Sequence, residues 1–403
     1  MAPLRLVTRD SHGPTRGVEG RMLGKPCWAE IDLDALAYNC RQVKAWIGAD
    51  TELMGVVKGN ANSLGAEEVA RVVLANGATR LAVARVDEAI ELRKAGFDVP
   101  IFIMDYVPAG EMEEVAEYRL TPPVMHWHTA TAISEASSAR NLVTPVHLKV
   151  DTGMGRFGLL SEEVVDFARR LGELPAVQLE GIYTHFSSAD EVDPSYTYQQ
   201  FGVFKQVLDD LERAGISIPV RHVCNSPATL RFPEMHLDMV RVATAFVRYP
   251  SAVTSHAIHL RRVLTVKSRV GRIRTLPAGS SISYGRLYTT TCPTKVALVM
   301  AGFGDGDVMG RQRLHRGAVL VRGQRAPILG KICMDQCVVD VSHIPDVQQD
   351  DEVVLLGSQG EAEITIPEIR SLVGAFSGFL SARIPRVYRQ GDDTRVHTLT
   401  TRS

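Results

Sequence analysis

The chain lacks the features typical of membrane, secreted and nucleic-acid-binding proteins. Its 403 residues include 45 Lys and Arg against 46 Asp and Glu, so no net charge attracts nucleic acid or an anionic membrane surface. The longest apolar stretches, such as residues 296–301, are far too short to cross a bilayer. Residues 1–24 mix Arg, Asp, His, Gly and Pro without the apolar core of a signal peptide. We therefore expect a cytoplasmic protein with no nucleic-acid or membrane partner.

Cysteine motifs and repeats are absent as well. The six cysteines are Cys27, Cys40, Cys224, Cys292, Cys333 and Cys337, and they form neither a CxxC pair nor a Cys/His pair with zinc-site spacing. Such scattered cysteines in a cytoplasmic chain argue against structural disulfides and against a structural metal. No internal repeat or low-complexity tract interrupts the sequence.

What the chain does contain is an alternation of short apolar segments with amphipathic ones. Eight candidate strands cover residues 53–58, 81–86, 101–105, 123–127, 146–151, 179–186, 220–225 and 239–243. Helical patterns at 66–74, 86–95, 161–174 and 198–214 lie between them. Eight alternating strand and helix units over roughly 200 residues predict an α/β fold with a parallel (β/α)8 barrel.

The pattern changes after about residue 257. Strand-like segments separated by turn signals then dominate, with one helical stretch near 366–372. We predict a mostly β C-terminal domain over 258–403 that follows a barrel over 27–257. Residues 1–26 carry Pro, Gly and charge without periodicity, which predicts a loose N-terminal extension.

Lys58 is the most informative single residue. It ends the apolar run 53–57 and precedes a turn of small residues, 59–65. A buried strand that ends in this way places an amine at the carboxyl end of a sheet, where neighbouring groups can lower its pKa and a Schiff base can form. On this stretch alone, a lysine that merely caps a strand explains the pattern equally well.

Other polar side chains also follow predicted strands. Lys149 with Asp151, Thr184 with His185, Asn225 with Ser226, and Arg241 all fall at or near carboxyl ends. Barrel enzymes keep their catalytic residues at this end of the strands. The sequence therefore predicts one site that gathers residues from several strands.

Several motifs occur in the order and approximate spacing of a known family. They are VKGNA at 57–61, KVDTGMGR at 149–156, THF at 184–186, NS at 225–226, VR at 240–241, SYG at 283–285, GDG at 304–306, CMDQ at 333–336 and RIPR at 383–386. Together they resemble the alanine racemase family from about residue 28 to residue 388. KVDTGMGR and CMDQ are specific, whereas the two- and three-residue matches carry weight only together.

The resemblance implies an isomerase that uses pyridoxal 5'-phosphate (PLP) to interconvert the L and D forms of alanine or a related small amino acid. It also implies a homodimer whose subunits share residues at each active site. Racemisation needs a base on each face of the substrate, because PLP weakens the Cα–H bond without choosing a side. The family pattern assigns one face to Lys58 and the other to Tyr284 of the second subunit. A free tyrosine has a pKa of about 10, so it needs cationic neighbours to act near neutral pH.

The resemblance also assigns cofactor and substrate contacts. Arg241 matches the residue that faces the pyridine nitrogen, and an arginine there donates a hydrogen bond without readily giving up its proton. His185 matches the residue beside the cofactor ring. The remaining matches are Asn225, Ser226, Ala243 and Thr244 for the phosphate, Arg156 for the phenolic oxygen and the substrate, Lys149 as the lysine that supports Arg156 and is carbamylated in many members, and Met334 for the substrate carboxylate.

This chain departs from the family pattern near the cofactor anchor. After the lysine the family normally reads AxAYGHG, whereas here Asn62 replaces the tyrosine that binds the phosphate and Ser63-Leu64 replace Gly-His. Ala382 replaces a tyrosine that many members place before their last motif. Loss of one hydrogen bond to a phosphate costs about 1 to 3 kcal/mol unless another group replaces it.

Four alternatives stay open. The chain could be a divergent PLP enzyme that acts on another amino acid as a racemase, lyase or decarboxylase, or it could bind PLP without catalysis. His126 and His128 could hold a metal, although an HxH pair after a strand is more often exposed and unligated. The glycines at 302, 304 and 306 could form a nucleotide loop, but they lack the dinucleotide-motif spacing. We expect no metal.

Overall fold

The computed structural model describes residues 5–7, 26–247, 257–310, 316–374 and 379–397, which form two compact units. The first, called the barrel unit below, comprises Ala35–Ala61 and Gly65–Arg261. The second, called the β unit, comprises Met1–Asp34, Asn62–Leu64 and Arg262–Ser403.

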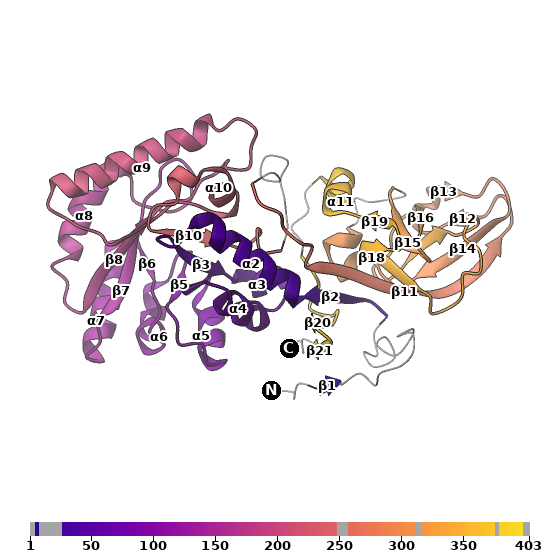
Figure 1. Cartoon of the computed structure of the whole chain (residues 1–403), viewed down its shortest axis with the longest axis horizontal. Helices are drawn as coiled ribbons and strands as arrows, with labels where there is room; N and C mark the ends of the chain where they lie inside the picture. The colour runs from indigo at the N-terminus through magenta and orange to yellow at the C-terminus, as the bar shows by residue number, and fades with distance from the viewer. Residues whose placement is uncertain (1–4, 8–25, 248–256, 311–315, 375–378, 398–403) are drawn as a thin grey trace. The chain divides into compact units, whose positions relative to one another are not determined.

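Eight parallel strands form the centre of the barrel unit (Figure 1). They are β3 (Glu52–Val56), β4 (Arg80–Val83), β5 (Ile101–Ile103), β6 (Pro123–Val124), β7 (Thr144–Lys149), β8 (Val177–Tyr183), β9 (Val220–His222) and β10 (Met239–Val242). Ladders join them in the orders β10-β3-β4-β5 and β6-β7-β8-β9. Backbone bonds bridge the two remaining gaps, from Ile103 N to Thr121 O at 2.9 Å and from Arg241 N to Cys224 O at 3.1 Å. The predicted barrel and its eight strands are confirmed.

Helices alternate with these strands and lie outside them in Figure 1. They are α2 (Leu33–Ile47), α3 (Lys58–Ser63), α4 (Ala66–Ala75), α5 (Val86–Lys94), α6 (Met112–Glu117), α7 (Trp127–Ala139), α8 (Val164–Leu171), α9 (Ser195–Arg213) and α10 (Ser226–Arg231), with short 3-10 turns at Ala109–Glu111, Ser161–Glu163 and Pro233–Met235. In α8 the buried residues are Val164, Phe167, Ala168 and Leu171. Their spacing of three and four residues puts them on one helical face.

Side chains fill the interior of the barrel. The core cluster there consists of Met54, Val56, Ala82, Phe102, Tyr183, Val220 and Met239. Gly181 on β8 faces the His147 ring so closely that an added Cβ would lie 2.6 Å from two ring atoms. Only glycine therefore fits here without displacing that histidine.

The β unit is built on one 11-stranded sheet. Its strands, in sheet order, are β1 (Arg5–Val7), β21 (Asp393–His397), β20 (Arg386–Gln390), β2 (Trp28–Asp32), β11 (Leu264–Leu276), β14 (Thr294–Val299), β17 (Cys337–Asp340), β16 (Gln324–Leu329), β15 (Ala318–Val321), β18 (Glu352–Gln359) and β19 (Ala362–Ile364). A hairpin of β12 (Ser281–Ile282) and β13 (Tyr288–Thr289), helix α11 (Ile366–Val373) and three 3-10 turns complete it. The predicted mostly β second domain is confirmed.

The structure divides the chain differently from the predicted boundaries. Residues 28–32 form β2, which pairs antiparallel with β11 and parallel with β20. This segment therefore belongs to the β unit, although the prediction put it in a barrel over 27–257. The pairing joins residues more than 200 positions apart, which local periodicity does not reveal. Of the predicted loose extension, Arg5–Val7 pairs with β21, and residues 1–4 and 8–25 lie outside the described ranges.

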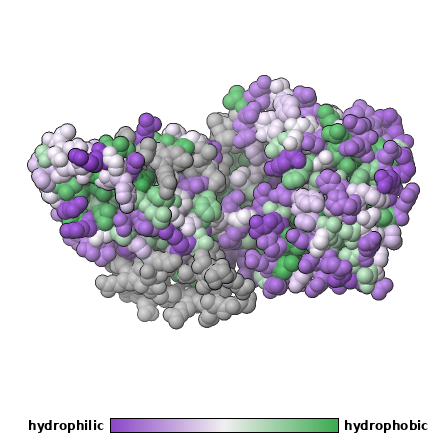
Figure 2. Space-filling view, turned by 180° about the vertical axis from the view of Figure 1, so that it is seen from behind, coloured by the Kyte–Doolittle hydropathy of each residue, from purple (hydrophilic) through white to green (hydrophobic). Residues whose placement is uncertain are grey.

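The helices of the described ranges include none that is both long and apolar enough to cross a bilayer. On the molecular face shown in Figure 2, hydrophilic and hydrophobic residues are mixed rather than separated into one broad apolar band.

We predict that Gly181→Ala lowers the free energy of unfolding by about 1 to 3 kcal/mol, because the added methyl group overpacks the barrel interior against His147. Gly202→Ala is the matched control, since Gly202 is exposed in α9 and an added Cβ meets nothing within 4 Å. That variant should gain up to about 1 kcal/mol from helix propensity. Urea unfolding curves measure both changes. Equal stability of the two variants would contradict the tight packing at position 181.

Candidate active site

Lys58 lies at the carboxyl end of β3 and begins a left-handed turn. Gly59, Asn60, Ala61, Asn62 and Ser63 have φ angles of 61°, 53°, 52°, 54° and 69°. Left-handed helical geometry costs roughly 1 to 2 kcal/mol for each residue with a Cβ. Bonds from Ala61 N to Val57 O at 2.7 Å and from Ala66 N to the Asn60 side-chain oxygen at 2.7 Å hold the turn. The surrounding structure thus maintains a strained backbone beside Lys58.

The last residues of this turn have hydrogen-bond partners in the β unit, to which Asn62–Leu64 belong. Arg386 Nε donates to Ser63 O at 2.8 Å, and the Tyr388 hydroxyl donates to Leu64 O at 2.8 Å. Arg386 and Tyr388 are each 1% exposed. These buried donors supply hydrogen bonds to two carbonyl groups of the left-handed turn that have no partner in a regular helix or sheet.

Lys149 ends β7 and is 4% exposed, and its Nζ donates to Met104 O at 3.1 Å. Burial is the largest cause that lowers its pKa, and the positive charges of Arg156, Arg241 and Lys58 lower it further. Asp105 opposes them only in part, so the pKa of Lys149 is about 8. An appreciable fraction of this amine is therefore uncharged near neutral pH.

Arg241 on β10 is 3% exposed and donates to backbone carbonyls around it. Its Nη2 donates to Thr184 O at 2.8 Å and to Val223 O at 3.1 Å, and it lies 3.3 Å from Nδ1 of His185. Burial lowers the pKa of Arg241 to about 10, which leaves it charged at neutral pH. Carbonyl oxygens stabilise a buried guanidinium without neutralising it.

His185 follows β8 and carries an uncharged ring. Burial, followed by the positive charges of Arg241 and Arg156, lowers the pKa of His185 to about 3. Lys149 and Lys58 act on the ring in the same direction. The barrel unit therefore brings together five of the sequence-predicted site residues, four of them cations.

The predicted phosphate residues form a second group in the barrel unit. Asn225 caps α10 by accepting a bond from Ala228 N at 3.1 Å, and Ser226 Oγ accepts one from Ala243 N at 2.9 Å. Thr244 follows Ala243 directly and is half-buried. The carboxyl ends of β9 and β10 thus present hydroxyl, amide and backbone groups side by side.

Tyr284 and Met334 belong to the β unit, not to the barrel unit that holds the other predicted site residues. Tyr284 is 72% exposed and Met334 is 53% exposed. Their loops adjoin, because Ser283 Oγ donates to Lys331 O at 2.6 Å and lies 3.5 Å from Cys333 Sγ. The two side chains are therefore presented on neighbouring exposed loops.

Arg383, the first residue of the RIPR motif, supports the Met334 loop. It donates from Nη2 to Met334 O at 3.2 Å and contacts Asp305 at 3.1 Å and Asp335 at 2.8 Å. An added Cβ at Gly302 or Gly304 would lie within 3.0 Å of Met334 O. Two of the three glycines of the possible nucleotide loop, Gly302 and Gly304, thus allow close packing against residues 333–334.

The two histidines of the HxH pair stack on each other, with ring centroids 5.6 Å apart. Across the described part of the chain, no group of three or more His, Cys, Asp or Glu side chains is arranged to hold a metal ion. His126 also contacts Tyr106 edge to face. An aromatic cluster accounts for the pair.

The fold and site define an enzyme of the (β/α)8 class, with a cationic site at the carboxyl ends of its strands. The family model "Alanine racemase, N-terminal domain" matches residues 31–248, and "Alanine racemase, C-terminal domain" matches residues 263–390. An alanine racemase of Halothermothrix orenii is 41% identical over 374 residues, which are 92% of this chain and 98% of the relative. The chain belongs to the alanine racemase family.

Solved structures agree with this assignment. Alanine racemase of Clostridium difficile 630 superposes with a TM-score of 0.87 at 35% identity, and 93% of this chain and 98% of that chain are covered. The Bacillus anthracis alanine racemase with bound L-Ala-P superposes with a TM-score of 0.86 at 32% identity and the same coverage.

The family is PLP-dependent, and the charges of the barrel unit fit that cofactor. The charges of Arg241, Arg156, Lys149 and Lys58 all act on the His185 ring, whereas Asp105 is an acid that acts on Lys149. PLP carries a phosphate and a phenolic oxygen, which are both anionic acceptors. A lysine amine, a buried arginine and an excess of positive charge are the groups that such a molecule requires.

We predict that the stability of the protein relative to its Lys149→Met variant rises as pH increases from about 8 to about 10.5. The unfolded lysine, with a pKa near 10.5, binds more protons in this window than the folded one, so a higher pH removes the penalty for burying the charge. The difference in free energy of unfolding between the protein and Lys149→Met should increase by about 1 to 3 kcal/mol over this pH range. Urea unfolding in bicarbonate-free buffer measures it.

Lys205→Met is the control for that experiment, because Lys205 is exposed on α9. It should leave the pH dependence of stability unchanged. A flat difference between the protein and Lys149→Met over the same window would contradict the lowered pKa.

Proposed function

We propose that this protein is a PLP-dependent alanine racemase that interconverts L- and D-alanine by a two-base mechanism. The observation that carries the proposal is the position of Lys58. Its amine lies at the carboxyl end of β3 beside a strained turn, and its charge acts with those of Lys149, Arg156 and Arg241 on an uncharged histidine, His185. The membership of the chain in the alanine racemase family supports the choice of reaction and substrate.

Bound PLP would supply an electron sink that weakens the Cα–H bond of the amino acid. Lys58 would hold the cofactor through its amine and then move a proton on one face of the substrate. Arg241 would donate a hydrogen bond to the pyridine nitrogen and keep its own proton, because a guanidinium remains charged in proteins. A protonated pyridine would withdraw electrons more strongly, so this arginine favours simple proton exchange over other PLP reactions.

The phosphate would bind at the carboxyl ends of β9 and β10. Asn225, Ser226, Ala243 and Thr244 supply polar side chains and backbone amides there. Asn62, where most of the family has a tyrosine, is half-buried in the left-handed turn. Its shorter amide would offer a weaker anchor than a tyrosine hydroxyl, so we expect PLP to be held mainly by the other residues.

Arg156 would bond the phenolic oxygen of PLP and position the substrate. We propose that Lys149 is carbamylated and orients Arg156 as in many family members. Carbon dioxide reacts with uncharged amines, and the pKa of about 8 leaves part of Lys149 in that form. The negative charge of a carbamate would also offset some of the local excess of cations.

Tyr284 would serve the second face from the other subunit of a homodimer, and Met334 of that subunit would contact the substrate carboxylate. Tyr284, Leu287, Met334 and Phe379 are each about half exposed or more in the β unit. Exposed large apolar side chains on neighbouring loops are typical of a surface that a second chain covers.

Balanced charge and dispersed cysteines support a cytoplasmic location.

We expect the purified protein with PLP to form D-alanine from L-alanine and to incorporate deuterium at Cα in D2O. Lys58→Ala should abolish both signals. Tyr284→Phe should slow conversion by about 10²- to 10⁴-fold, the usual contribution of a general base. Tyr288→Phe, which loses a hydroxyl nearby in β13, is the control and should remain active. A panel that includes serine identifies any other substrate, and full activity of Tyr284→Phe would contradict the two-base mechanism.

Mixing subunits tests whether the active sites are shared. Neither Lys58→Ala nor Tyr284→Phe should be active alone. After random reassociation, half of the dimers combine one subunit of each kind, and one of their two sites holds both an intact Lys58 and an intact Tyr284. We expect about one quarter of the wild-type activity. If both bases came from the same chain, mixing would restore nothing.

A further inference from the structure

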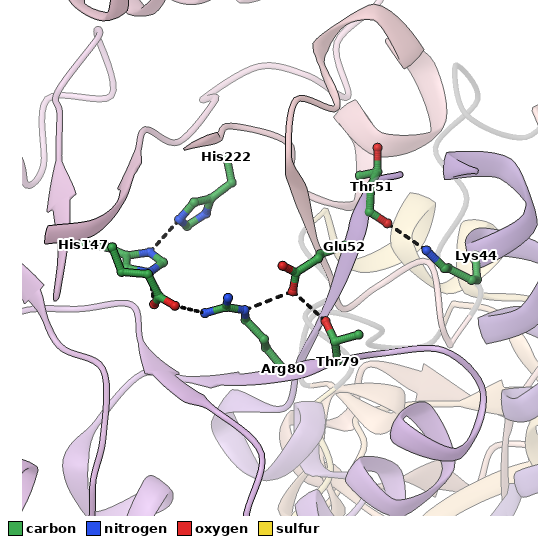
Figure 3. A network of polar contacts seen from close by, with 8 residues as sticks. Lys44, Thr51, Glu52, Thr79, Arg80, His147 and His222 are labelled. Atoms are coloured by element: carbon green, nitrogen blue, oxygen red, sulfur yellow. Dashed lines mark hydrogen bonds and ion pairs between the residues drawn. The ribbon is translucent and has the colours of Figure 1, made fainter. Parts of the chain in front are cut away.

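A continuous network of polar side chains to which the proposed mechanism gives no role crosses the interior of the barrel (Figure 3). His222 on β9 contacts His147 on β7, with Nε2 and Nδ1 2.8 Å apart. His147 Nε2 lies 3.0 Å from Glu180 Oε2 on β8. Arg80, the first residue of β4, contacts Glu180 Oε1 at 2.9 Å and Glu52 of β3 at 3.1 Å.

The network of polar side chains connects to the proposed active site at Arg241. Arg241 Nη1 lies 2.9 Å from Nδ1 of His222, and both side chains are buried, at 3% and 0% exposure. A guanidinium has five N–H donors and no acceptor. Nδ1 of His222 must therefore carry a lone pair, and the ring must be the neutral tautomer with its proton on Nε2.

The same count of donors and acceptors assigns the tautomer of His147. Nε2 of His222 donates to Nδ1 of His147, so that this nitrogen also carries a lone pair. The proton of a neutral His147 is then on Nε2, where it faces the Glu180 carboxylate. All donors point in one direction, from Arg241 through two neutral histidines to one carboxylate. Burial lowers the pKa of both histidines, which agrees with neutral rings.

Glu180 ends this series of hydrogen bonds because an ionised carboxylate accepts hydrogen bonds and donates none. Burial by itself would raise its pKa, but hydrogen bonds from His147 and Arg80 overcome that effect and hold the pKa at about 2. One carboxylate oxygen accepts from His147 and the other from Arg80. Phe102 packs against both histidine rings, with centroids 4.8 and 5.7 Å away, and Tyr183 stacks on His222 at 5.0 Å. The rings are thus held in place from the sides.

We propose that Glu180, His147 and Arg80 are positioning residues for Arg241: they fix the tautomer of His222 so that a ring lone pair faces the buried guanidinium. The wrong tautomer would set two N–H groups against each other across 2.9 Å. Arg241 would then lose its side-chain acceptor at Nη1 and keep only the His222 carbonyl there, at 3.1 Å. The proposal rests on the proposed function in one respect, the contact of Arg241 with the PLP ring.

Glu180→Gln tests the proposal because both neighbours of Glu180, Arg80 and His147, donate to it. A glutamine has only one accepting oxygen, so it can accept from only one of them. Arg80 cannot accept a hydrogen bond, so the amide oxygen must face Arg80 and the NH2 group must face His147. His147 then accepts at Nε2 and donates from Nδ1, so His222 accepts at Nε2 and carries its proton on Nδ1. The resulting conflict falls at Arg241, because its Nη1 keeps a second acceptor in the His222 carbonyl. The variant should invert both tautomers.

Nitrogen-15 NMR of histidine-labelled holoenzyme reports the tautomers directly. In the unaltered protein we expect His147 and His222 to be protonated at Nε2 alone, and in Glu180→Gln at Nδ1 alone. The variant should also shift the visible absorbance of bound PLP and reduce PLP affinity or kcat by about tenfold, the effect of one opposed buried donor pair.

The double variant Arg80→Met with Glu180→Gln provides the rescue. Without the guanidinium, the amide oxygen is free to face His147, so the original tautomers and most of the lost affinity should return. Glu52→Gln is the matched control, because Glu52 contacts Arg80 and Thr79 and no histidine. It should leave both rings unchanged.

An Nδ1 proton on either histidine in the unaltered protein would overturn the proposal, even if no variant folds. Unchanged tautomers in Glu180→Gln, or no rescue in the double variant, would overturn it as well. The tautomer measurement needs no turnover. A protein with the expected tautomers and no racemase activity would therefore reject the proposed function while supporting the positioning chain.

Discussion

The buried positive charge of Arg241 is the constraint on which the site depends. The side chain is 3% exposed, and its partners in the described structure are backbone carbonyls and histidine nitrogens rather than a carboxylate. Burial of a charge is costly unless polar groups replace its hydration shell. Here the carbonyls of Thr184, His222 and Val223 replace that shell, together with a ring nitrogen whose tautomer is set by a distant acid, and they keep the guanidinium charged and fixed.

The protonation of two other site residues follows from burial together with this excess of positive charge. Burial and the charges of Arg241, Arg156, Lys149 and Lys58 keep His185 neutral. Burial and the charges of Arg156, Arg241 and Lys58 lower the pKa of Lys149. Such repulsion opposes folding, and the left-handed turn after Lys58 adds backbone strain. An anionic cofactor would relieve the repulsion, which gives binding energy a direct electrostatic source. Part of the strained turn is held by buried donors of the β unit.

Much of the fold could be predicted from periodicity. The eight barrel strands and the mostly β second domain were found because alternation and apolar runs are local signals. β2 was missed, since its partners β11 and β20 are far along the chain. The sequence also placed Lys58, Lys149, His185 and Arg241 at strand ends, and the barrel brings them together. The catalytic roles of these residues rest on the family and on chemistry, and they remain proposals.

The sequence by itself determined the eight barrel strands, the mostly β character of the second domain, and the family. These depend on residues near one another or on strings such as KVDTGMGR and CMDQ. Only the tertiary structure decided the connections across the barrel. Glu180, His147 and His222 carry no shared motif, and each is unremarkable within its own strand. They become one directed hydrogen-bond network because closure of the parallel sheet points their side chains into the same interior, where both histidine rings are fully buried.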